Sequence, residues 1–410
     1  MIAILRPIKL AVFFDQTLHS GGAYQQALNA ALLVNKLPLE LAEPIFFTNH
    51  KKNIETLRMF GIDAIFLSLP VYRRFGLKIR QYITHNRKLG LLKKLLGVNA
   101  FEYCFLKYDV DLVYFLSPTP LSNNLEELNY IATVWDLCHR DNPEFPEVRT
   151  NRVFEWREQM YHSILPKAVG ILVDSPLGKL NLVRRYGIDD ERIHVMPFTP
   201  AKGTQVSDLE YQAGYIDICQ KYKLDVPYVF YPAQFWAHKN HVYLLEGLKC
   251  LESQYEQKVG AIFSGGDQGN LAHIKRITAK LGLGDRVRFT GFVSNEEMPY
   301  LYKQSLALVM PTYFGPTNLP PLEAFSLAVP VLYSDMTGLG DQVEKAALLM
   351  DLQEPMTMAI HLAALIETPA LREKLIENGY SLLLENSDEN CIQILSHILS
   401  DFRRRRACWG

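Results

Sequence analysis

Short runs of apolar residues alternate along this chain with longer stretches in which the apolar residues recur at helical spacing. The short runs are rich in β-branched and aromatic residues, which favour strands. A strand followed by a helix and a second strand is a βαβ unit, in which both strands lie parallel in one sheet. In the first half of the chain, the predicted strands are 10–14, 44–48, 64–68, 112–116, 130–135, 170–175 and 192–198, and a helix is predicted at 23–35.

The pattern lapses from Thr199 to Ile216, which predicts a linker, and then resumes. We therefore predict an α/β fold of two tandem, doubly wound, Rossmann-like domains that face a cleft, at 1–200 and 201–385. A C-terminal segment at 386–410 is predicted to hold a helix and a basic tail. In the second half, the predicted strands are 228–233, 260–265, 286–292, 306–312 and 328–334, and the predicted helices are 241–253, 270–281, 296–304, 321–327 and 389–402.

Composition changes this picture little. The 410 residues are too many for one core, and 48% apolar with 21% charged residues is ordinary for a soluble globular protein. The net charge of −1 excludes an electrostatic nucleic-acid binder for the chain as a whole. Ligands of doubly wound sheets bind beyond the carboxyl ends of the strands, so we expect the site in the cleft between the two domains.

Three further features of the sequence indicate the cellular compartment of the protein. Six scattered cysteines form no CxxC pair, which predicts reduced thiols and neither a zinc nor a redox motif. No apolar run reaches the ~20 residues that span a bilayer. The apolar segment of the opening MIAILRPIKLAVFFDQ contains Lys9 and ends at Asp15 without a small-residue cleavage site, so a buried strand is predicted there rather than a signal peptide. A cytoplasmic protein is therefore expected.

The segment FGPTNLPPLEAF, at 314–325, lies between two predicted strands. Pro321 suits the first turn of a helix, where its missing N–H has no helical partner. The loop at 315–319 would then present unpaired backbone amides at the positive end of a helix dipole, which suits a phosphate or the oxygens of a sugar. Glu323 is expected in the first helical turn, where its carboxylate can accept two hydrogen bonds from a diol. An ordinary tight βα turn fits the same residues, and chemistry alone leaves both interpretations open.

Six further segments of the sequence contribute to a resemblance to a known family. They are YPAQFWAHKNHVYLLEGL (231–248), FSGGDQ (263–268), the stretch 286–335, TGLGDQVEKAALLMD (337–351), SGGAYQQALNAA (20–31) and WDLCHRDNPEFPEV (135–148). Together with FGPTNLPPLEAF, these segments resemble the family 4 glycosyltransferases of the two-domain GT-B fold. The likeness is highly specific over 228–351 and weaker over 1–200.

The resemblance implies an enzyme that transfers a hexose, mannose-like or similar, from a nucleotide diphosphate sugar to a saccharide or lipid-linked saccharide acceptor. It implies retention of anomeric configuration, a role in polysaccharide or glycan biosynthesis, and no cofactor or metal besides the nucleotide sugar as co-substrate. Lys239 matches the basic residue that neutralises the diphosphate, and Glu323 matches the second glutamate of the E-x7-E motif, which holds the ribose hydroxyls. The resemblance implies further donor-binding positions. They are Gly21 and Gly22 near the phosphates, Gln234 at the diphosphate, Phe292 and Val293 around the base, and Thr317, Asn318 and Leu319 at the sugar and phosphate.

Three positions depart from the family's pattern. Gly315 stands where the first glutamate of E-x7-E is expected, and Gln234 stands five residues before Lys239, where an arginine is usual. A His-Asp pair appears as Trp135-Asp136. These changes leave an alternative open, a catalytically inactive glycosyltransferase-like module that binds a nucleotide sugar or a partner. An epimerase or phosphorylase of the same fold fits less well, because no acid-base carboxylates and no setting for a pyridoxal phosphate lysine are identified.

Asp136, His139 and Lys239 are the predicted catalytic residues. Asp136 follows a predicted strand and therefore lies at a strand's carboxyl end. His139 follows three residues later, and two interpretations weigh equally for it: a polar contact near the reacting carbon, or a histidine at a helix start or in a loop. Neither Asp136 nor His139 is spaced from another potential ligand as in a metal-binding motif, so no metal site is predicted.

The stretch from Arg73 to Gly97 contains eight Lys or Arg and no Asp or Glu, interleaved with apolar residues at helical spacing. A basic amphipathic helix of this kind predicts contact with an anionic membrane surface, and hence a peripheral position at the inner face of the membrane. A solvated helix face is the other interpretation. The terminal RRRR at 403–406 either joins the same patch or is a tail. No nucleic-acid partner is predicted, because no basic-aromatic module is present.

Overall fold

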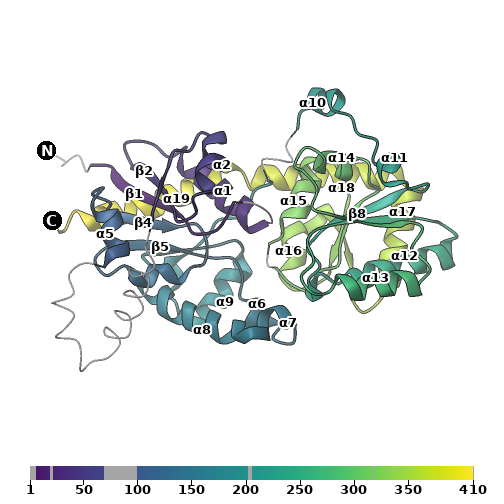
Figure 1. Ribbon diagram of the computed structural model, residues 1–410, viewed down its shortest axis with the longest axis horizontal. Coiled ribbons are helices and arrows are strands. Elements are labelled where there is room, and N and C mark those ends of the chain that lie inside the picture. The colour runs from purple at the N-terminus through teal and green to yellow at the C-terminus, as the bar shows by residue number, and fades with distance from the viewer. Residues whose placement is uncertain (1–5, 19–21, 69–98, 202–205, 316, 410) are drawn as a thin grey trace. The chain divides into compact units, whose positions relative to one another are not determined.

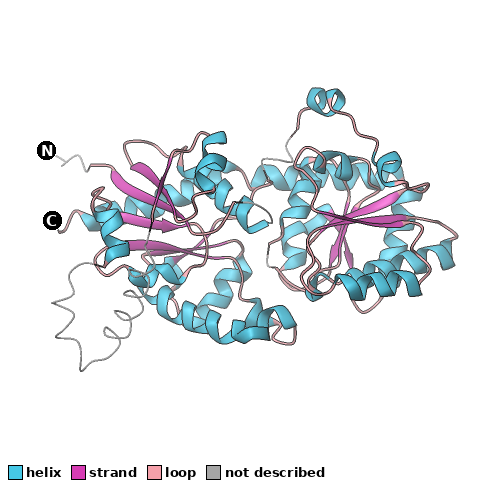
Figure 2. Ribbon diagram, in the orientation of Figure 1, coloured by secondary structure: helices cyan, strands magenta, loops and turns pink. Residues whose placement is uncertain are grey.

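The computed structural model describes residues 6–18, 22–68, 99–201, 206–315 and 317–409 (Figure 1). The chain forms two compact units. The first consists of Met1–Leu137, Glu155–Pro197 and Asp388–Gly410, and the second of Cys138–Phe154 and Phe198–Ser387. Each unit is a parallel sheet covered by helices, as the alternating pattern predicts (Figure 2).

The sheet of the first unit has seven described strands in the order β3-β2-β1-β4-β5-β6-β7, and every described pair is parallel. Side chains alternate between its faces: Leu10 and Val12 enter one hydrophobic cluster, and Ala11 and Phe13 enter the other. Both faces are covered, which is why these strands are continuous apolar runs in the sequence. The strands are β1 (Ile8–Phe14), β2 (Ala42–Thr48), β3 (Ala64–Phe66), β4 (Leu112–Phe115), β5 (Asn129–Val134), β6 (Gly170–Val173) and β7 (Ile193–Val195).

Helices from distant parts of the chain cover the two faces of this sheet. Helices α1 and α19 pack on one face, and α5, α8 and α9 pack on the other. No described helix of either unit combines the length and the apolar character needed to cross a membrane. The α-helices of the first unit are α1 (Gly22–Val34), α2 (Asn53–Met59), α5 (Ala100–Leu106), α8 (Val153–Ile164, which begins in the second unit), α9 (Pro176–Tyr186) and α19 (Asp388–Arg406), and its 3₁₀-helices are η2 (Pro120–Asn124), η4 (Leu165–Lys167) and η5 (Asp190–Arg192).

The C-terminal helix α19 returns the chain to the first unit. Leu395, Leu399 and Phe402 are buried in the cluster that also contains the apolar face of α1. The RRRR sequence forms the last turn of α19, where Arg403 Nη1 donates to the Glu40 carbonyl at 2.7 Å. Arg406 also forms an ion pair with Asp111, so this segment lies at the amino-terminal side of β2 and β4.

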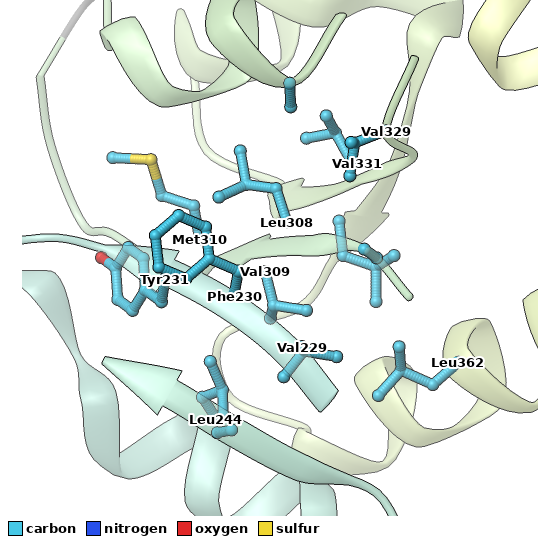
Figure 3. Close-up of a cluster of buried hydrophobic side chains, with 14 of the residues drawn as sticks. Val229, Phe230, Tyr231, Leu244, Leu308, Val309, Met310, Val329, Val331 and Leu362 are labelled. Carbon is cyan, nitrogen blue, oxygen red and sulfur yellow. The ribbon is translucent and has the colours of Figure 1, made fainter. Parts of the chain in front are cut away.

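The sheet of the second unit has six described strands in the order β10-β9-β8-β11-β12-β13, again all parallel. Its centre is a cluster in which strands β8 and β11 bury Val229, Phe230, Leu308 and Val309 together (Figure 3). The sequence pattern did not separate β13 from the turn before it. The strands are β8 (Tyr228–Pro232), β9 (Gly260–Ser264), β10 (Val287–Gly291), β11 (Leu308–Met310), β12 (Val331–Ser334) and β13 (Ala347–Met350).

Three expectations about this unit need correction. The linker predicted from Thr199 to Ile216 contains helix α10, because Ser207 and Glu210 form a reciprocal capping box at its start. Helix α15 begins at Leu319, two residues before the predicted start, so Glu323 lies in the second helical turn and not the first. Residues 138–154, predicted in the first domain, group with the second unit.

The second unit's helices surround its sheet. They are α6 (Cys138–Asp141), α7 (Pro146–Arg149), α10 (Asp208–Ala213), α11 (Ile218–Tyr222), α12 (His241–Tyr255), α13 (Leu271–Lys280), α14 (Met298–Lys303), α15 (Leu319–Ser326), α16 (Leu339–Val343), α17 (Pro355–Glu367) and α18 (Pro369–Glu385), with 3₁₀-helices η3 (Thr150–Arg152), η7 (Ala237–Lys239) and η8 (Glu344–Ala346).

Candidate functional site

The strand order of the second unit locates its ligand site. The chain builds β8, β9 and β10 outward in one direction and then returns to place β11 on the other side of β8. Open parallel sheets bind ligands at this topological switch point, beyond the carboxyl ends of the two strands. Here the loop at 233–240 follows β8 and the loop at 311–318 follows β11, so these two loops form the candidate site.

Backbone hydrogen bonds hold the two loops together. The Tyr313 amide donates to the His238 carbonyl at 2.9 Å, and the buried Tyr231 hydroxyl donates to the Lys239 carbonyl at 2.9 Å. Asn240 then adopts a left-handed conformation, with φ of 50°, and leads into α12. Asparagine tolerates this conformation better than most residues. The backbone on both sides of the Lys239 side chain is therefore fixed.

Lys239 reaches across from one loop to the other. Its ammonium donates to Asn318 Oδ1 at 3.1 Å, although the two residues lie 79 positions apart in the chain. Asn318 Nδ2 donates to the Gly315 carbonyl at 2.9 Å and to the Tyr333 hydroxyl at 2.6 Å. A carbonyl can only accept, so these bonds determine which end of the amide faces Lys239. The predicted donor-binding residues Lys239 and Asn318 are thus in direct contact.

Gln342 of α16 holds the backbone of Asn318. Its Oε1 accepts from the Asn318 amide at 3.0 Å, and its Nε2 donates to the Asn318 carbonyl at 2.6 Å. The same Oε1 accepts from the Tyr333 hydroxyl at 3.0 Å. These bonds satisfy the polar groups around a side chain that is only 8% exposed, as buried polar groups require. The sequence analysis did not single out Tyr333 or Gln342.

His241, the first residue of α12, adds no charge to this region. Its ring packs against Tyr231 and Phe235, with ring centroids 4.7 and 4.8 Å away. Complete burial, followed by the nearby charge of Lys239, lowers the pKa of His241 to about 3. The ring is neutral at physiological pH, so the charge of Lys239 is not supplemented from this position.

Glu323 lies on the inner side of α15 and is 7% exposed. The hydroxyl of Tyr302, on α14, donates to Glu323 Oε2 at 2.7 Å. Burial raises the pKa of the Glu323 carboxyl to about 7, and the hydrogen bond from Tyr302 acts in the opposite direction. A carboxyl with this pKa changes its protonation state near neutral pH, and pKa values shifted in this way concentrate at functional sites.

Gln234 follows β8 and occupies the position where the resemblance leads one to expect an arginine. Its Oε1 accepts from the indole Nε1 of Trp236 at 3.0 Å and from Nε2 of Gln268 at 3.3 Å. The amide oxygen of Gln234 is thereby held within its own loop and by the β9–α13 turn.

Glycines allow the ends of β8, β9 and β10 to approach closely. A Cβ at Gly265 would lie 2.4 Å from the carbonyl oxygen of Ala233, and the residue has a φ of +154°. Phe292 follows β10, is 61% exposed, and its ring lies against Gly266, where a Cβ would be 3.1 Å away. Val293 packs partly against the core. The residues predicted near a nucleobase therefore lie at the same edge of the sheet as the two loops.

An acidic residue from the segment 138–154 contacts the loop that contains Lys239. Glu147 accepts from the His238 amide at 2.9 Å and also contacts the His238 ring. Burial would raise the pKa of Glu147, but the hydrogen bonds from His238 outweigh it and lower the pKa. Phe314 stacks on the His238 ring at 3.8 Å, and Phe145 packs on Phe314 and Tyr313. His238 is therefore held by Glu147 and the aromatic ring of Phe314.

The other two predicted catalytic residues belong to different units. Asp136 follows β5 in the first unit, where Arg157 Nη2 donates to its Oδ1 at 2.5 Å and to its carbonyl at 2.8 Å. His139 is the second residue of α6 and belongs to the second unit, where its ring is fully buried and packs edge-on against Phe154 at 5.5 Å. His139 is thus a buried residue near the start of α6, and its contact with the reacting carbon stays a prediction.

The remaining predicted positions are placed as follows. Leu319 is the buried first residue of α15, and Thr317 precedes it in the loop. Gly22 begins α1, whereas Gly21 and the basic stretch from Arg73 to Gly97 lie outside the described residues. In the part of the chain that is described, no three His, Cys, Asp or Glu side chains are arranged to hold a metal ion.

The first unit has its own switch point, between β1 and β4. Asp15 follows β1 and accepts a hydrogen bond from Ser117, which follows β4. Burial raises the pKa of Asp15, against the effect of hydrogen bonds from Ser117 and Thr119. His50 Nε2 lies 2.9 Å from the Asp15 carbonyl oxygen. The sequence analysis used Asp15 only to argue against a signal peptide, although its place directly after a strand was visible.

Comparison with known proteins gives this geometry a context. Residues 219–382 match the family described as Glycosyl transferases group 1, and this range lies wholly within the second unit. The matched range includes both loops of the candidate site, with Lys239, Asn318 and Glu323.

Individual proteins that resemble this chain are glycosyltransferases by name or share its fold. The chain is 26% identical over 249 residues to O-antigen chain mannosyltransferase B of Escherichia coli, covering 60% of this chain and 64% of that protein. It is 24% identical over 237 residues to alpha-D-kanosaminyltransferase of Streptomyces kanamyceticus, covering 57% and 59%. The crystal structure of Anabaena HepE in complex with UDP and glucose superimposes with a TM-score of 0.71 at 16% identity, covering 96% and 99%. The fold is therefore the two-domain GT-B fold, as predicted.

Proposed function

We propose that this protein is a glycosyltransferase that moves a hexose from a nucleoside diphosphate sugar to a saccharide or lipid-linked saccharide acceptor in polysaccharide biosynthesis. One observation carries the proposal. Lys239 and Asn318 meet at the switch point of the unit that matches the group 1 glycosyl transferases. A fixed ammonium there suits the diphosphate, whose negative charge grows as the glycosidic bond breaks.

The chemistry that we propose needs no nucleophile from the protein. The bond between the anomeric carbon and the β-phosphate oxygen breaks, and the acceptor hydroxyl oxygen bonds to that carbon on the same face. The hydroxyl proton passes to the leaving phosphate, so anomeric configuration is retained. Lys239 stabilises the leaving diphosphate, Glu323 accepts hydrogen bonds from the ribose hydroxyls, and we propose that no metal takes part. Positioning would then supply most of the rate acceleration.

The similar proteins suggest which nucleotides and sugars to test first as donors. HepE was crystallised with UDP and glucose, and the two similar enzymes are named for mannose and kanosamine transfer. We propose a uridine or guanosine diphosphate hexose as the first donors to test. The lipid-linked acceptor and a position at the cytoplasmic membrane face depend on the basic stretch of the sequence and remain proposals.

The test is calorimetric titration of UDP, GDP and their hexose conjugates into the wild-type protein and Glu323→Ala. We expect one nucleotide to bind tightly and the substitution to weaken it by about 1–3 kcal/mol, because hydrogen bonds to a charged carboxylate are lost. Glu373→Ala removes an exposed glutamate of α18 and should leave affinity unchanged. Binding of no nucleotide to the wild-type protein would overturn the proposal.

A second candidate function is nucleotide-sugar binding without turnover. Two observations favour it: Gly315 stands where a glutamate would contact the donor sugar, and Gln234 brings no positive charge. Hydrolysis or transfer measured with the donor that binds, in the presence of lipid-linked saccharides, separates the two functions. Product formed by the wild-type protein and lost in Lys239→Ala supports the enzyme, and tight binding without product supports the binding module.

A further inference from the structure

Gly315 has a backbone conformation and surroundings that exclude a side chain. Its φ is +110°, a region that L-residues rarely adopt. A Cβ at this position would lie 2.9 Å from Asn318 Oδ1 and 3.0 Å from Asn318 Nδ2. The side-chain amide of Asn318 thus occupies the space next to Gly315, and a residue with a Cβ would have to displace it.

Moving that amide aside costs free energy, because four hydrogen bonds from three residues hold it and its backbone. The Gly315 carbonyl and the Tyr333 hydroxyl accept from Nδ2, and Gln342 bonds to both the amide N–H and the carbonyl of Asn318. Tyr333 comes from β12 and Gln342 from α16, so the support reaches the loop from two further elements. The oxygen of the same side-chain amide accepts from the Lys239 ammonium at 3.1 Å.

We propose that Asn318 is a specificity-determining residue of the donor site that orients the Lys239 ammonium toward the diphosphate, and that Tyr333 and Gln342 are its positioning residues. This inference rests on the proposed function. An amide oxygen aligns an ammonium through a hydrogen bond and leaves its full positive charge available. A carboxylate in the same space would align it equally well but cancel much of its charge, in a buried setting where such pairing is strong.

The proposal separates recognition of the diphosphate from recognition of the nucleoside. The network touches Lys239, whereas the carboxylate assigned to the ribose is Glu323, which Tyr302 supports from another helix. Loosening the network should therefore weaken binding of diphosphates and leave binding of the nucleoside part intact. A general loss of folding would weaken both.

The experiment measures UDP, GDP, uridine and guanosine binding by calorimetry on the wild-type protein, Gln342→Met and Tyr333→Phe. Both substitutions keep the side-chain volume and remove only the hydrogen bonds. We expect diphosphate affinity to fall about tenfold and nucleoside affinity to stay nearly unchanged, with only a modest fall in melting temperature from the lost hydrogen bonds. Gln353→Met changes an exposed glutamine of the same unit and should have no effect on either ligand.

A second pair of variants tests the charge argument. Asn318→Asp keeps the shape of the side chain and places a carboxylate against Lys239, and Asn318→Ala removes the partner altogether. We expect the aspartate to weaken diphosphate binding more than the alanine does, because it neutralises the cation in addition to losing the supporting bonds.

Three results overturn the inference. An unchanged diphosphate affinity in both Gln342→Met and Tyr333→Phe removes the positioning role, and an equal loss of nucleoside and diphosphate affinity shows a merely structural one. A tighter diphosphate complex in Asn318→Asp than in Asn318→Ala removes the charge argument. Failure of the wild-type protein to bind any diphosphate is a different outcome, since it overturns the proposed function together with the inference built on it.

Discussion

At the scale of single residues, Glu323 meets two opposing demands. Its burial favours the neutral acid and raises the pKa to about 7, whereas the ribose contact that we propose needs the carboxylate. A raised pKa means that the stability this group contributes is complete below the unfolded pKa near 4.5 and is lost as pH rises toward 7. The same rise in pH creates the form that accepts hydrogen bonds from a diol.

The affinity for a nucleotide sugar should therefore increase with pH through about 7 and level off above it, since the phosphates of a nucleotide sugar do not titrate in this range. In Tyr302→Phe the carboxylate loses its hydrogen bond at 2.7 Å, so the midpoint of this increase should move to higher pH. Calorimetry across pH 5.5–8.5 (roughly 1.5 units on each side of the expected midpoint) measures it.

Glu323→Gln is the control for this prediction, because an amide does not titrate. Its affinity should be weaker than that of the wild-type protein at high pH and should not vary with pH. A wild-type affinity that is flat across the range would show that the Glu323 carboxyl keeps an ordinary pKa or does not contact the nucleotide.

The two residues that depart from the pattern implied by the resemblance offset each other in charge. Gln234 brings one positive charge fewer than an arginine, and Gly315 brings one negative charge fewer than a glutamate. Lys239 donates its hydrogen bond to the neutral side-chain amide of Asn318. The net charge of the candidate site is thus the same as if both charged residues were present.

At the scale of elements, helix α15 is held in place from behind by α18. Gly379 of α18 lies so close to Phe325 of α15 that a Cβ would be 2.7 Å from the Phe325 ring. Phe325 is 2% exposed and two residues from Glu323, so the packing of the two helices sets where that carboxylate lies. At this contact the two helices are packed so closely that a methyl group on residue 379 has no room.

Gly379→Ala should destabilise the protein by about 1–2 kcal/mol, since overpacking costs more than the roughly 1 kcal/mol that alanine gains in helix propensity. Urea denaturation measures the change, and the same variant should bind nucleotide more weakly because α15 must shift. Gly284→Ala is the matched control: a Cβ there meets no atom within 4 Å, and its stability should change by less than about 0.5 kcal/mol. Equal stabilities for the two variants would contradict the close packing of α18 on α15.

At the scale of the whole molecule, the chain leaves the first unit at Pro197 and returns to it at Asp388. Helix α19 then covers one face of the first sheet, with Leu399 fully buried beside residues of α1. Lys36 and Asp388 form an ion pair at 2.6 Å at the start of that helix. The first unit therefore needs the last residues of the chain for a complete core.

Leu399→Ala should destabilise the first unit by about 2–5 kcal/mol, because the cavity cannot close between two packed layers. Hydrogen exchange with peptide resolution should show faster exchange in β1 and α1 and unchanged exchange in β8 and β11. Gln393→Ala, at an exposed position of the same helix, should leave both units unchanged. Faster exchange spread evenly over both sheets would mean that the two units unfold together.

Most of the secondary structure could be predicted from the local pattern of apolar and polar residues. Buried parallel strands are continuous apolar runs, so the predicted runs at 10–14 and 228–233 coincide with β1 and β8. Helix starts were harder to predict, because Pro320 and Pro321 both suit a first turn, and the pattern could not tell that α15 begins at Leu319. Helix α10 was missed because its capping box lies in a stretch without apolar periodicity.

By itself the sequence determined the two-unit α/β architecture, the strand-loop-helix setting of Lys239 and Asn318, and the chemistry that such loops offer. Those features depend on residues that are neighbours in the chain. Only the tertiary structure decided that Asn318 faces Lys239, that Tyr302 and burial set the pKa of Glu323, that His139 is buried, and that α19 completes the first unit. Each of these depends on contacts between segments far apart in sequence, and no local periodicity encodes which distant side chain will fill a given space.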